Sequence, residues 1–446
     1  MNKKFNFYRK KYPLFIYHNF DIYDDGIDLK IVYDFEIEGL THFNPYLRIS
    51  KNIIRGKIDN KFLNNIVFNL GCVELISYVK ATCSPNIEIR AGYLDVEQID
   101  FYKKLYFNGL GEFLYMNNIE IDQDHLFNII INHEKEIPYF IDYNGVGNLI
   151  PVGGGKDSCV TLELLKDMDN TCFVINPKEA NINCVNVSEN SYIYVKRVID
   201  KRLIELNSEG YLNGHTPFSA IVAFTSYLVS YLSDKKYIVL SNEGSANEAT
   251  VIGTNVNHQY SKTYEFECDF NNYTKKYLSE NIYYFSFLRP LSEFQIANIF
   301  SELKKYHSVF RSCNVGSKRD NWIWCCNCAK CLFVYIILSP FLSHDELISI
   351  FGCDLYEKEE LLDTFIELLG YKDAKPFECV GTYMESRCAV SFAIKKYGKS
   401  ELPFLLKYYK EHFNLEFNYV NSYNEKNNLP CEFNDVLKGV LRCYDR

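Results

Sequence analysis

The sequence has neither a surplus of positive charge nor an apolar run long enough to cross a membrane. Its 446 residues include 48 Lys or Arg and 57 Asp or Glu, a formal net charge of -9. This balance argues against broad nucleic-acid binding, because neutralising phosphates takes an excess of cations on one face. The strongly apolar stretch at residues 331–342 is interrupted by Ser339-Pro340 and is shorter than the roughly 20 residues that span a bilayer. We therefore expect no nucleic-acid partner and no membrane insertion.

The beginning of the chain, MNKKFNFYRKKYPLF, also lacks the apolar core of a signal peptide. The 16 cysteines are dispersed over a long chain, unlike those of a small secreted disulfide scaffold. Together these features predict a reducing, cytoplasmic compartment. Nothing in the pattern predicts an oligomeric state.

Low-complexity linkers and internal repeats are missing as well, and 47% of the residues are hydrophobic, which is enough for about two or three packed cores. We predict an α+β domain at residues 1–147, an α/β domain with a doubly wound parallel sheet at residues 148–345, and a helical region at residues 346–446. Strands are expected at residues 29–35, 87–91, 149–152, 172–175, 192–195 and 237–240. Helices are expected at residues 97–108, 158–166, 217–232, 292–304, 345–351, 358–369 and 388–397.

A glycine-rich loop follows the apolar segment 149–152 directly and leads into a helical pattern. Its residues are Gly153, Gly154, Gly155, Lys156, Asp157 and Ser158. Glycines let the backbone approach a triphosphate, and the amino end of the following helix favours an anion. Lys156, Asp157 and Ser158 would add a cation, an acceptor for a metal ion or water, and a hydroxyl donor.

The loop resembles the PP-loop S-G-G-x-D-S of N-type ATP pyrophosphatases, and departs from it in having Gly153 where serine is usual. The competing phosphate loop, G-x-x-x-x-G-K-[ST], does not occur at this position. We therefore predict a PP-loop (HUP-type) fold that binds ATP and cleaves it to AMP and pyrophosphate, with Asp157 as a partner of Mg²⁺. The alternative is a glycine-rich turn without a ligand.

Four cysteines have the spacing of a metal site. Cys325, Cys328 and Cys331 form a C-x2-C-x2-C run, and Cys313 lies a short loop upstream. Four thiolates could close a tetrahedral Zn²⁺ site, with Cys326 as a spacer. Buried reduced cysteines and an iron–sulfur cluster are the alternatives.

Several longer strings point to one family. They are Ala81-Thr82-Cys83-Ser84-Pro85, Leu212-Asn213-Gly214-His215-Thr216-Pro217, Ser241-Asn242-Glu243, Asn257-His258-Gln259-Tyr260-Ser261-Lys262, Leu288-Arg289-Pro290-Leu291-Ser292-Glu293 and Lys375-Pro376-Phe377-Glu378-Cys379-Val380-Gly381. Through these strings, which extend over most of the chain, the sequence resembles the family of UDP-N-acetyl-α-D-muramoyl-L-alanyl-L-glutamate epimerases, the MurL family.

The resemblance implies an isomerase that uses ATP and Mg²⁺ to invert the terminal L-Glu of a UDP-muramoyl-dipeptide to D-Glu, releasing AMP and pyrophosphate. It implies a role in peptidoglycan synthesis and cell wall biogenesis, and through them in cell shape and cell division. Pyridoxal phosphate could not serve, because the glutamate nitrogen is held in a peptide bond and cannot form a Schiff base.

Within the quoted strings, His215, His258 and Lys262 are candidates for catalysis, although each could also be a solvated loop residue. Glu243 follows the strand expected at residues 237–240, where doubly wound sheets bind ligands, and could orient ribose, metal or water or cap a helix instead. Asn257 is a candidate for substrate binding.

Arg289 and Arg387 are candidates for binding the γ-carboxylate or the diphosphate of the substrate, because a guanidinium matches both anions. Surface ion pairing is the alternative for Arg387. Cys83 and Cys379 are candidates for thiol acid/base chemistry at the α-carbon, against the alternative that both are simply buried.

Two other functions stay open from the sequence. The chain could be a PP-loop enzyme that adenylates a deazapurine or a tRNA base, although the acidic charge disfavours tRNA. It could also be a noncatalytic module that binds a nucleotide and zinc, which intact Lys156, Asp157 and Ser158 disfavour.

Overall fold

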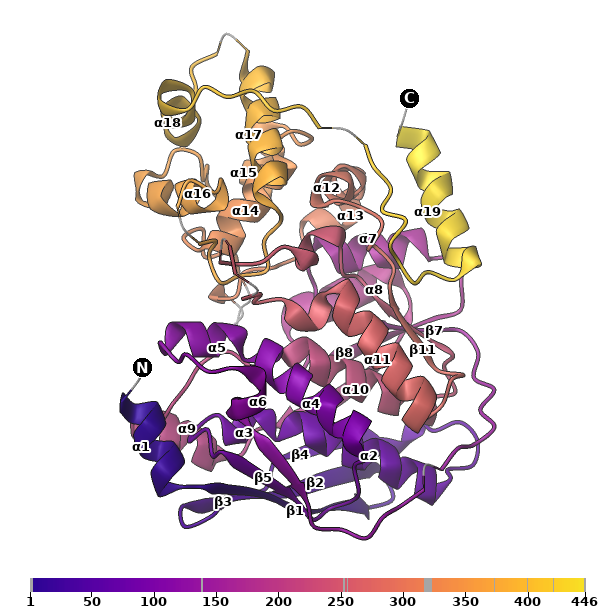
Figure 1. The fold of residues 1–446 in the computed structure, drawn as a ribbon. Helices are drawn as coiled ribbons and strands as arrows, with labels where there is room; N and C mark the ends of the chain where they lie inside the picture. Colours follow the sequence, from indigo (N-terminus) through magenta and orange to yellow (C-terminus); the bar gives the residue numbers. More distant parts are fainter. Residues whose placement is uncertain are drawn as a thin grey trace.

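One mixed sheet runs through most of the molecule (Figure 1) in a computed structural model that describes residues 3–137, 139–251, 253–254, 256–316, 323–372, 374–398, 400–419 and 421–444. The strand order is β11-β10-β7-β8-β9-β4-β2-β1-β5-β6, and β3 pairs with β2. The strands are β1 Leu14–Asp24, β2 Asp28–Ile37, β3 Thr41–Phe43, β4 Tyr46–Ser50, β5 Asn86–Ile89, β6 Asn128–Ile131, β7 Asn148–Pro151, β8 Asn170–Ile175, β9 Ser191–Val198, β10 Tyr237–Leu240 and β11 Tyr283–Ser286.

The five strands from β7 to β11 are all parallel to one another. Numbered along the chain, they lie in the order 3-2-1-4-5, which is the order of a doubly wound sheet. The prediction of a doubly wound parallel sheet is confirmed for this half of the molecule. The point at which the strand order reverses lies beside β7, the strand that leads into the glycine loop.

The other half of the sheet joins this parallel half without a break. β4 pairs antiparallel with β9, from Tyr46 opposite Val198 to Ile49 opposite Val195. β2 and β1 follow as antiparallel neighbours, while β5 and β6 are again parallel. The boundary expected between residues 147 and 148 therefore falls inside one continuous sheet, and that division of the chain stays a prediction.

Helices cover the sheet and form a separate lobe above it in Figure 1. The α-helices are α1 Lys3–Lys11, α2 Asn60–Glu74, α3 Ile76–Val79, α4 Val96–Gly109, α5 Gly111–Met116, α6 Gln123–Leu126, α7 Lys156–Leu164, α8 Glu179–Ser188, α9 Lys201–Ser208, α10 Phe218–Leu232, α11 Tyr264–Tyr277, α12 Glu293–Glu302, α13 Lys304–His307, α14 Ala329–Leu338, α15 His344–Phe351, α16 Leu362–Leu368, α17 Tyr383–Tyr397, α18 Phe404–His412 and α19 Cys431–Tyr444. Most helices expected from the sequence begin and end within a few residues of these bounds.

Two hydrophobic cores lie on opposite faces of the parallel strands. Consecutive residues of a strand point to opposite faces, and accordingly Leu149 belongs to the core that contains α2, α4, α10 and α11, whereas Ile150 belongs to the core that contains α7, α8, α12, α14 and α17. Ile238 and Val239 of β10 divide in the same way. Helices on both faces complete the doubly wound architecture.

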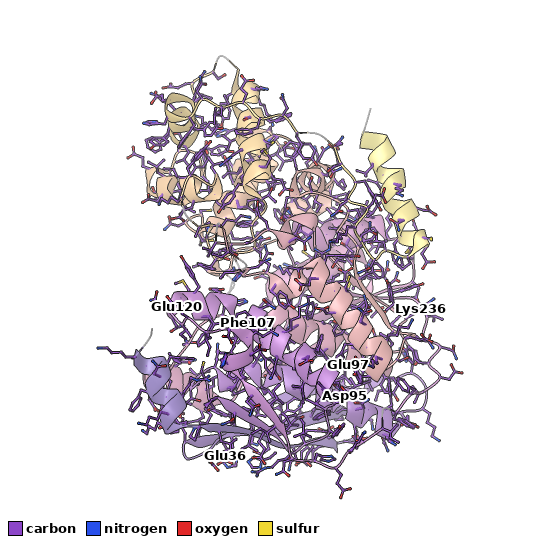
Figure 2. The ribbon with its side chains drawn as sticks, viewed as in Figure 1. Glu36, Asp95, Glu97, Phe107, Glu120 and Lys236 are labelled. Atoms are coloured by element: carbon purple, nitrogen blue, oxygen red, sulfur yellow. The ribbon has the colours of Figure 1, made fainter. Side chains whose placement is uncertain are left out.

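Contacts between α4 and α11 bind the amino-terminal region to the parallel half. Asp95 caps α4 through the backbone N–H of Gln98 and also accepts a hydrogen bond of 2.9 Å from the hydroxyl of Tyr277 on α11. Glu97 pairs with Lys276 at 2.5 Å. Figure 2 labels Asp95 and Glu97 at the beginning of α4, close to α11.

One helical stretch, Asn60–Val79, has the length and apolar composition of a membrane span, a segment that the sequence analysis passed over. It comprises α2 and α3, and 89% of it is buried inside the fold. A core helix meets the same criteria, so this stretch is weak evidence for a membrane segment.

Candidate active site

The glycine loop makes a tight turn between β7 and α7. Gly154 has a φ of +79°, which other residues rarely adopt, and a Cβ there would lie 3.1 Å from the backbone nitrogen of Asn181. A Cβ on Gly155 would lie 2.7 Å from the hydroxyl of Ser312. The backbone N–H of Gly153 donates to the hydroxyl of Ser158 at 3.0 Å, which closes the turn. Glycine is therefore required at position 154, and the turn directs the loop toward the amino end of α7.

This loop lines a cavity of about 470 Å³ at the carboxyl ends of the parallel strands. Ligands of doubly wound sheets bind at this edge, where the strand order reverses. Polar residues that line the cavity come from the loop, from the segments after β8 and β10, and from the carboxy-terminal third. They include Asp157, Ser158, Lys178, Asn181, Asn242, Glu243, Lys262, Arg311, Asn314, Lys330 and Cys379.

A buried group of charges lies beside the loop. Lys156 is 2% exposed, and its ammonium contacts the carboxylates of Asp157 and Glu293. Burial disfavours the charge of Lys156, but the two carboxylates raise its pKa above the usual value, so the ammonium persists. Asp157, Glu243 and Glu293 each bring an oxygen within 4.8 Å of the others. Carboxylate oxygens are the ligands that Mg²⁺ prefers, so this trio could hold such an ion.

At the other side of the cavity, Cys379 lies between cationic groups. The ammonium of Lys262 is 3.1 Å from its sulfur, the imidazole of His258 forms a hydrogen bond with it, and the ammonium of Lys330 contacts its carbonyl. Burial alone would raise the pKa of the Cys379 thiol, but Lys262, His258 and Lys330 together lower it to about 6. The sulfur is therefore a thiolate at neutral pH.

The carboxylate of Glu112 on α5 forms a hydrogen bond of 2.5 Å with Nδ1 of His258. Burial would lower the pKa of His258, but Cys379 and Glu112 raise it to about 9, so the imidazole is protonated at neutral pH. The ring of His215 packs against that of His258 at an angle of 47° with ring centroids 4.4 Å apart, and its Nδ1 lies 3.5 Å from the carboxylate of Glu112. Burial and the charge of His258 lower the pKa of His215 to about 4, so this ring is neutral.

Apart from the cysteine cluster, the predicted residues that do not line the cavity are Gly154, Lys156, His215, His258, Arg289, Arg387, Asn257 and Cys83. Arg289 is fully buried, and its guanidinium binds the carbonyls of Glu243 and Lys262 and the carboxylate of Glu267. It fixes the backbone that carries two cavity residues instead of facing a ligand. Cys83 is buried in the amino-terminal core, where burial raises its thiol pKa to about 12.

Arg387 and Asn257 also make local contacts. The guanidinium of Arg387 binds the carbonyls of Leu369 and Gly370 and lies 4.7 Å from the ring centre of Tyr371. Asn257 donates to the carbonyl of Ala246 and accepts from the backbone of Gln259, which shapes the loop that carries His258.

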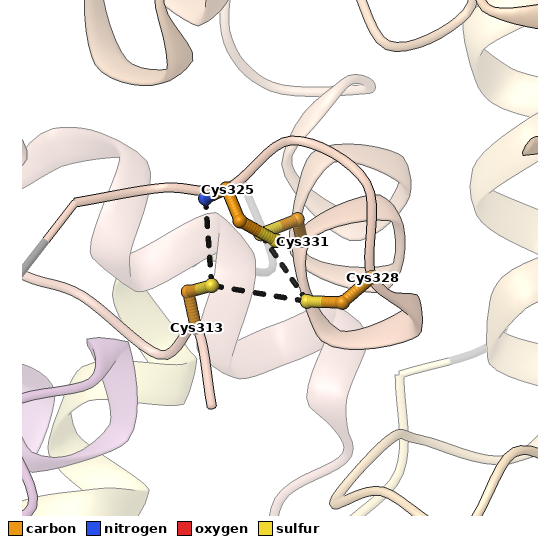
Figure 3. Close-up of side chains that lie close together, drawn as sticks. All are labelled: Cys313, Cys325, Cys328 and Cys331. Atoms are coloured by element: carbon orange, nitrogen blue, oxygen red, sulfur yellow. Dashed lines mark hydrogen bonds between the residues drawn. The ribbon is translucent and has the colours of Figure 1, made fainter. Parts of the chain in front are cut away.

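The cysteine cluster converges as the C-x2-C-x2-C spacing allows. Figure 3 shows the four side chains facing one another, and the sulfurs of Cys328 and Cys331 are 3.5 Å apart. Cys313 lies 3.8 Å from Cys328, and Cys325 lies 3.7 Å from Cys331. A tetrahedral site with Zn–S bonds of about 2.3 Å requires sulfurs about 3.8 Å apart. The sulfur of Cys326 contacts the carbonyl of Phe351 instead, at 3.1 Å.

Several residues in and beside the cavity were not singled out from the sequence, among them Glu293, Lys330 and Glu112. Glu293 stands at the end of one quoted string, and Lys330 lies inside the cysteine run, so both had a local signal. Glu112 had none, because only the packing of α5 brings it to His258. No disulfide joins the cysteines in the described part of the chain.

Comparisons with known proteins identify one family over most of the chain. Residues 6–287 match the family described as the MurL N-terminal domain, and residues 309–418 match the MurL C-terminal domain. A protein of Xanthomonas oryzae pv. oryzae is 35% identical over 71% of both chains, one of Salinispora tropica is 34% identical over 76% of both, and one of Micromonospora sp. is 33% identical over 74% of both. Each of these three relatives is named UDP-N-acetyl-alpha-D-muramoyl-L-alanyl-L-glutamate epimerase.

Proposed function

The chain belongs to the MurL family, and from this premise we propose that it is an isomerase that inverts the terminal L-Glu of UDP-N-acetylmuramoyl-L-Ala-L-Glu to D-Glu after adenylating its α-carboxylate with ATP. One observation carries the proposal. The glycine loop and the Cys379–Lys262 pair line the same cavity, so a nucleotide and a proton-transfer centre would meet there.

Adenylation would make the α-proton of the glutamate more acidic. The α-proton beside a free carboxylate is very weakly acidic, because its removal would place a second negative charge next to the first. A mixed anhydride with AMP removes that charge and lets the carbanion delocalise as an enolate. A positioned side chain of moderate basicity could then remove the proton, and protonation on the opposite face would invert the centre.

The loop from Gly153 to Ser158 would bind the phosphates of ATP through its backbone N–H groups, the hydroxyl of Ser158 and the amino end of α7. Asp157, Glu243 and Glu293 would bind Mg²⁺, a role that their shared separation of less than 4.8 Å fits. The ion would neutralise the phosphate oxygens, and Lys156, held between two of these carboxylates, would add a second positive charge.

Cys313, Cys325, Cys328 and Cys331 fit a structural Zn²⁺ site, because four sulfurs at tetrahedral separations leave no open position for a substrate. The site would fix the loop ahead of α14, which carries Lys330 into the cavity. We propose that the protein works in the cytoplasm on peptidoglycan precursors, where reduced thiols and the nucleotide-linked substrate are both available.

The test is incubation of the purified protein with ATP, Mg²⁺ and UDP-N-acetylmuramoyl-L-Ala-L-Glu in deuterated water. We expect substrate-dependent pyrophosphate, deuterium at the glutamate α-carbon and D-Glu after hydrolysis. Pyrophosphate release without inversion would support ATP cleavage and contradict either the proposed substrate or the proposed inversion step. If folded protein produced no pyrophosphate, no deuterium incorporation and no D-Glu, the catalytic proposal would be refuted.

The Asp157→Asn variant provides a sharper check, because it removes one charge from the proposed metal site at nearly constant volume. We expect pyrophosphate release to fall by about 10²-fold to 10³-fold, and the remaining activity to need more Mg²⁺. Asp167→Asn, an exposed position just after α7, is the matched control and should behave like the wild type. Equal activity of the two variants would remove Asp157 from the mechanism.

A further inference from the structure

Three side chains from distant parts of the sequence form a continuous chain that ends in the cavity. The carboxylate of Glu112 on α5 binds Nδ1 of His258 at 2.5 Å, and the ring of His258 hydrogen-bonds the sulfur of Cys379. A nucleophile, a base and a residue that orients the base, joined in this order, are the arrangement of enzymes that form covalent acyl intermediates.

A thiolate held in this way is poorly suited to remove a proton from carbon. An anion stabilised by two cations is a weak base, whereas carbon acids of this kind hold their protons strongly even when the neighbouring carboxylate is esterified. A thiolate sulfur keeps much of its nucleophilicity when its basicity falls, because its reactivity depends only partly on the basicity of the thiol. The geometry therefore favours attack on an acyl carbon over abstraction of the α-proton.

We propose that Cys379 is the nucleophile that receives the glutamyl group from the adenylate. The thiolate sulfur bonds to the acyl carbon, the bond from that carbon to the phosphate oxygen breaks, and AMP leaves with the electron pair of that bond. The product of this step is a thioester between Cys379 and the α-carboxyl group of the substrate. This inference rests on the proposed adenylation.

The same step would prepare a base for the α-proton. Lys262 lies 3.1 Å from the sulfur, and the negative charge of Cys379 is the first of the influences that raise the pKa of this buried ammonium. Acylation removes that charge while burial persists, so the pKa of Lys262 falls, although Glu243 and Asp157 continue to raise it. The ammonium would then give its proton to solvent more readily and leave an amine next to the thioester. The α-proton would pass to Lys262, and a water molecule on the opposite face would supply the proton that the enolate takes up, which is why deuterium from the solvent is expected at the α-carbon.

Water then completes the cycle. Its oxygen bonds to the acyl carbon, the carbon–sulfur bond breaks, and the thiolate of Cys379 is restored as the free D-Glu carboxylate leaves. His258, protonated and held by Glu112, can donate a proton to the departing sulfur and take it back. Summed with adenylation, the cycle consumes one ATP and one water and forms AMP and pyrophosphate.

Rapid acid quenching of the full-length protein during turnover with ATP, Mg²⁺ and UDP-N-acetylmuramoyl-L-Ala-L-Glu tests the thioester. Intact-protein mass spectrometry should detect an added mass equal to the substrate less one water. Neutral hydroxylamine should remove it, and proteolysis should locate it on the peptide that contains Cys379. Exchange of labelled pyrophosphate into ATP measures adenylation separately from this step.

The Cys379→Ser variant distinguishes the two steps. It should keep pyrophosphate exchange within about twofold of the wild type while AMP release and D-Glu formation fall by about 100-fold or more, because a serine hydroxyl is not ionised. Cys431→Ser, an exposed position at the beginning of α19, is the matched control and should retain the adduct and both activities.

Two results would refute the assignment of Cys379 as the nucleophile. One is D-Glu formation at the wild-type rate by Cys379→Ser. The other is wild-type protein that releases AMP and inverts glutamate without carrying the adduct at any quench time. Loss of pyrophosphate exchange in the wild type is a different result, because it refutes the adenylation on which this inference rests.

Discussion

At the scale of single residues, the charges around Cys379 set a pH window. The thiol pKa of about 6 and the His258 pKa of about 9 mean that thiolate and imidazolium coexist between these values. Below pH 6 the sulfur is protonated, and above pH 9 the imidazole loses its proton and stabilises the thiolate less. Chemistry that needs this ion pair should therefore decline on both sides of the window.

Alkylation by iodoacetamide measures the thiolate directly, because only the ionised sulfur reacts. The rate at Cys379 should be half-maximal near pH 6. Glu112→Gln removes the carboxylate that supports the charge of His258, so the midpoint should rise by about one pH unit, the equivalent of one charge-assisted hydrogen bond. Cys431 serves as an internal reference. An unchanged midpoint in the Glu112→Gln variant would contradict a positioning role for Glu112.

The sequence analysis singled out residues that belong to a recognisable local motif. Three glycines before Lys156 and Asp157 predict a phosphate loop, which stays a prediction, and the strings around His258 and Cys379 singled out both residues. It did not find Glu112, because a glutamate in a short helix has no pattern that distinguishes it from a solvated one. It misjudged Arg289, since an arginine that binds a substrate and one that binds buried carbonyls look alike in the sequence.

At the scale of elements, Arg289 joins three segments that border the cavity. Its guanidinium holds the carbonyl of Glu243 after β10, the carbonyl of Lys262 before α11 and the carboxylate of Glu267 on α11. Arg289→Met would leave the buried carboxylate of Glu267 without its cationic partner, although Asn428 would still donate to it; removing one member of a buried ion pair typically costs about 3–5 kcal/mol.

Urea unfolding of Arg289→Met should therefore show a lower free energy of unfolding by about that amount. The double variant Arg289→Met, Glu267→Gln should recover part of the loss, because the uncompensated charge is gone. Arg202→Met, which removes an exposed arginine paired with Glu205 and Glu209, is the control and should unfold close to the wild type. A double variant no more stable than Arg289→Met would contradict the charge argument.

The cysteine loop ahead of α14 carries a second prediction at this scale. Purified protein should contain about one zinc ion per chain by elemental analysis, and Cys328→Ser should lower that content together with the thermal midpoint. At low temperature, where the variant is still folded, the rate of pyrophosphate exchange should stay close to that of the wild type. The sulfurs of the cluster support the cavity but do not line it. Cys353→Ser, outside the cluster, should keep the metal. Iron in place of zinc, with its visible absorption, would identify a cluster of another kind.

The strands β2, β5, β7, β8, β9 and β10 were expected from apolar periodicity, but β1, β3, β4 and β6 and the long helices α2 and α11 were not. The strand β11 was missed, because its four residues, Tyr283–Ser286, contain too little pattern to separate a strand from a loop. The error is small in length but matters for topology, since β11 is the edge strand that completes the order of the parallel half.

At the scale of the whole molecule, the sequence suggested a boundary at residue 147 because a turn signal precedes the glycine loop there. Pairing between β4 and β9 depends on strands about 150 residues apart, and no local pattern encodes such a register. The two family matches divide the chain elsewhere, at residues 287 and 309. The amino-terminal strands and the parallel strands are therefore better regarded as one folding unit.

A fragment of residues 148–446 tests this view. Without the first 147 residues, β9 would expose the edge that pairs with β4, and α10 would lose the apolar partners that α2 supplies in the shared core. An open strand edge next to uncovered apolar surface favours aggregation. We expect the fragment to be insoluble alone and soluble as a complex when residues 1–147 are expressed with it, as measured by size-exclusion chromatography. A monomeric fragment with native helix content and a cooperative thermal transition would instead establish residues 148–446 as an independent domain.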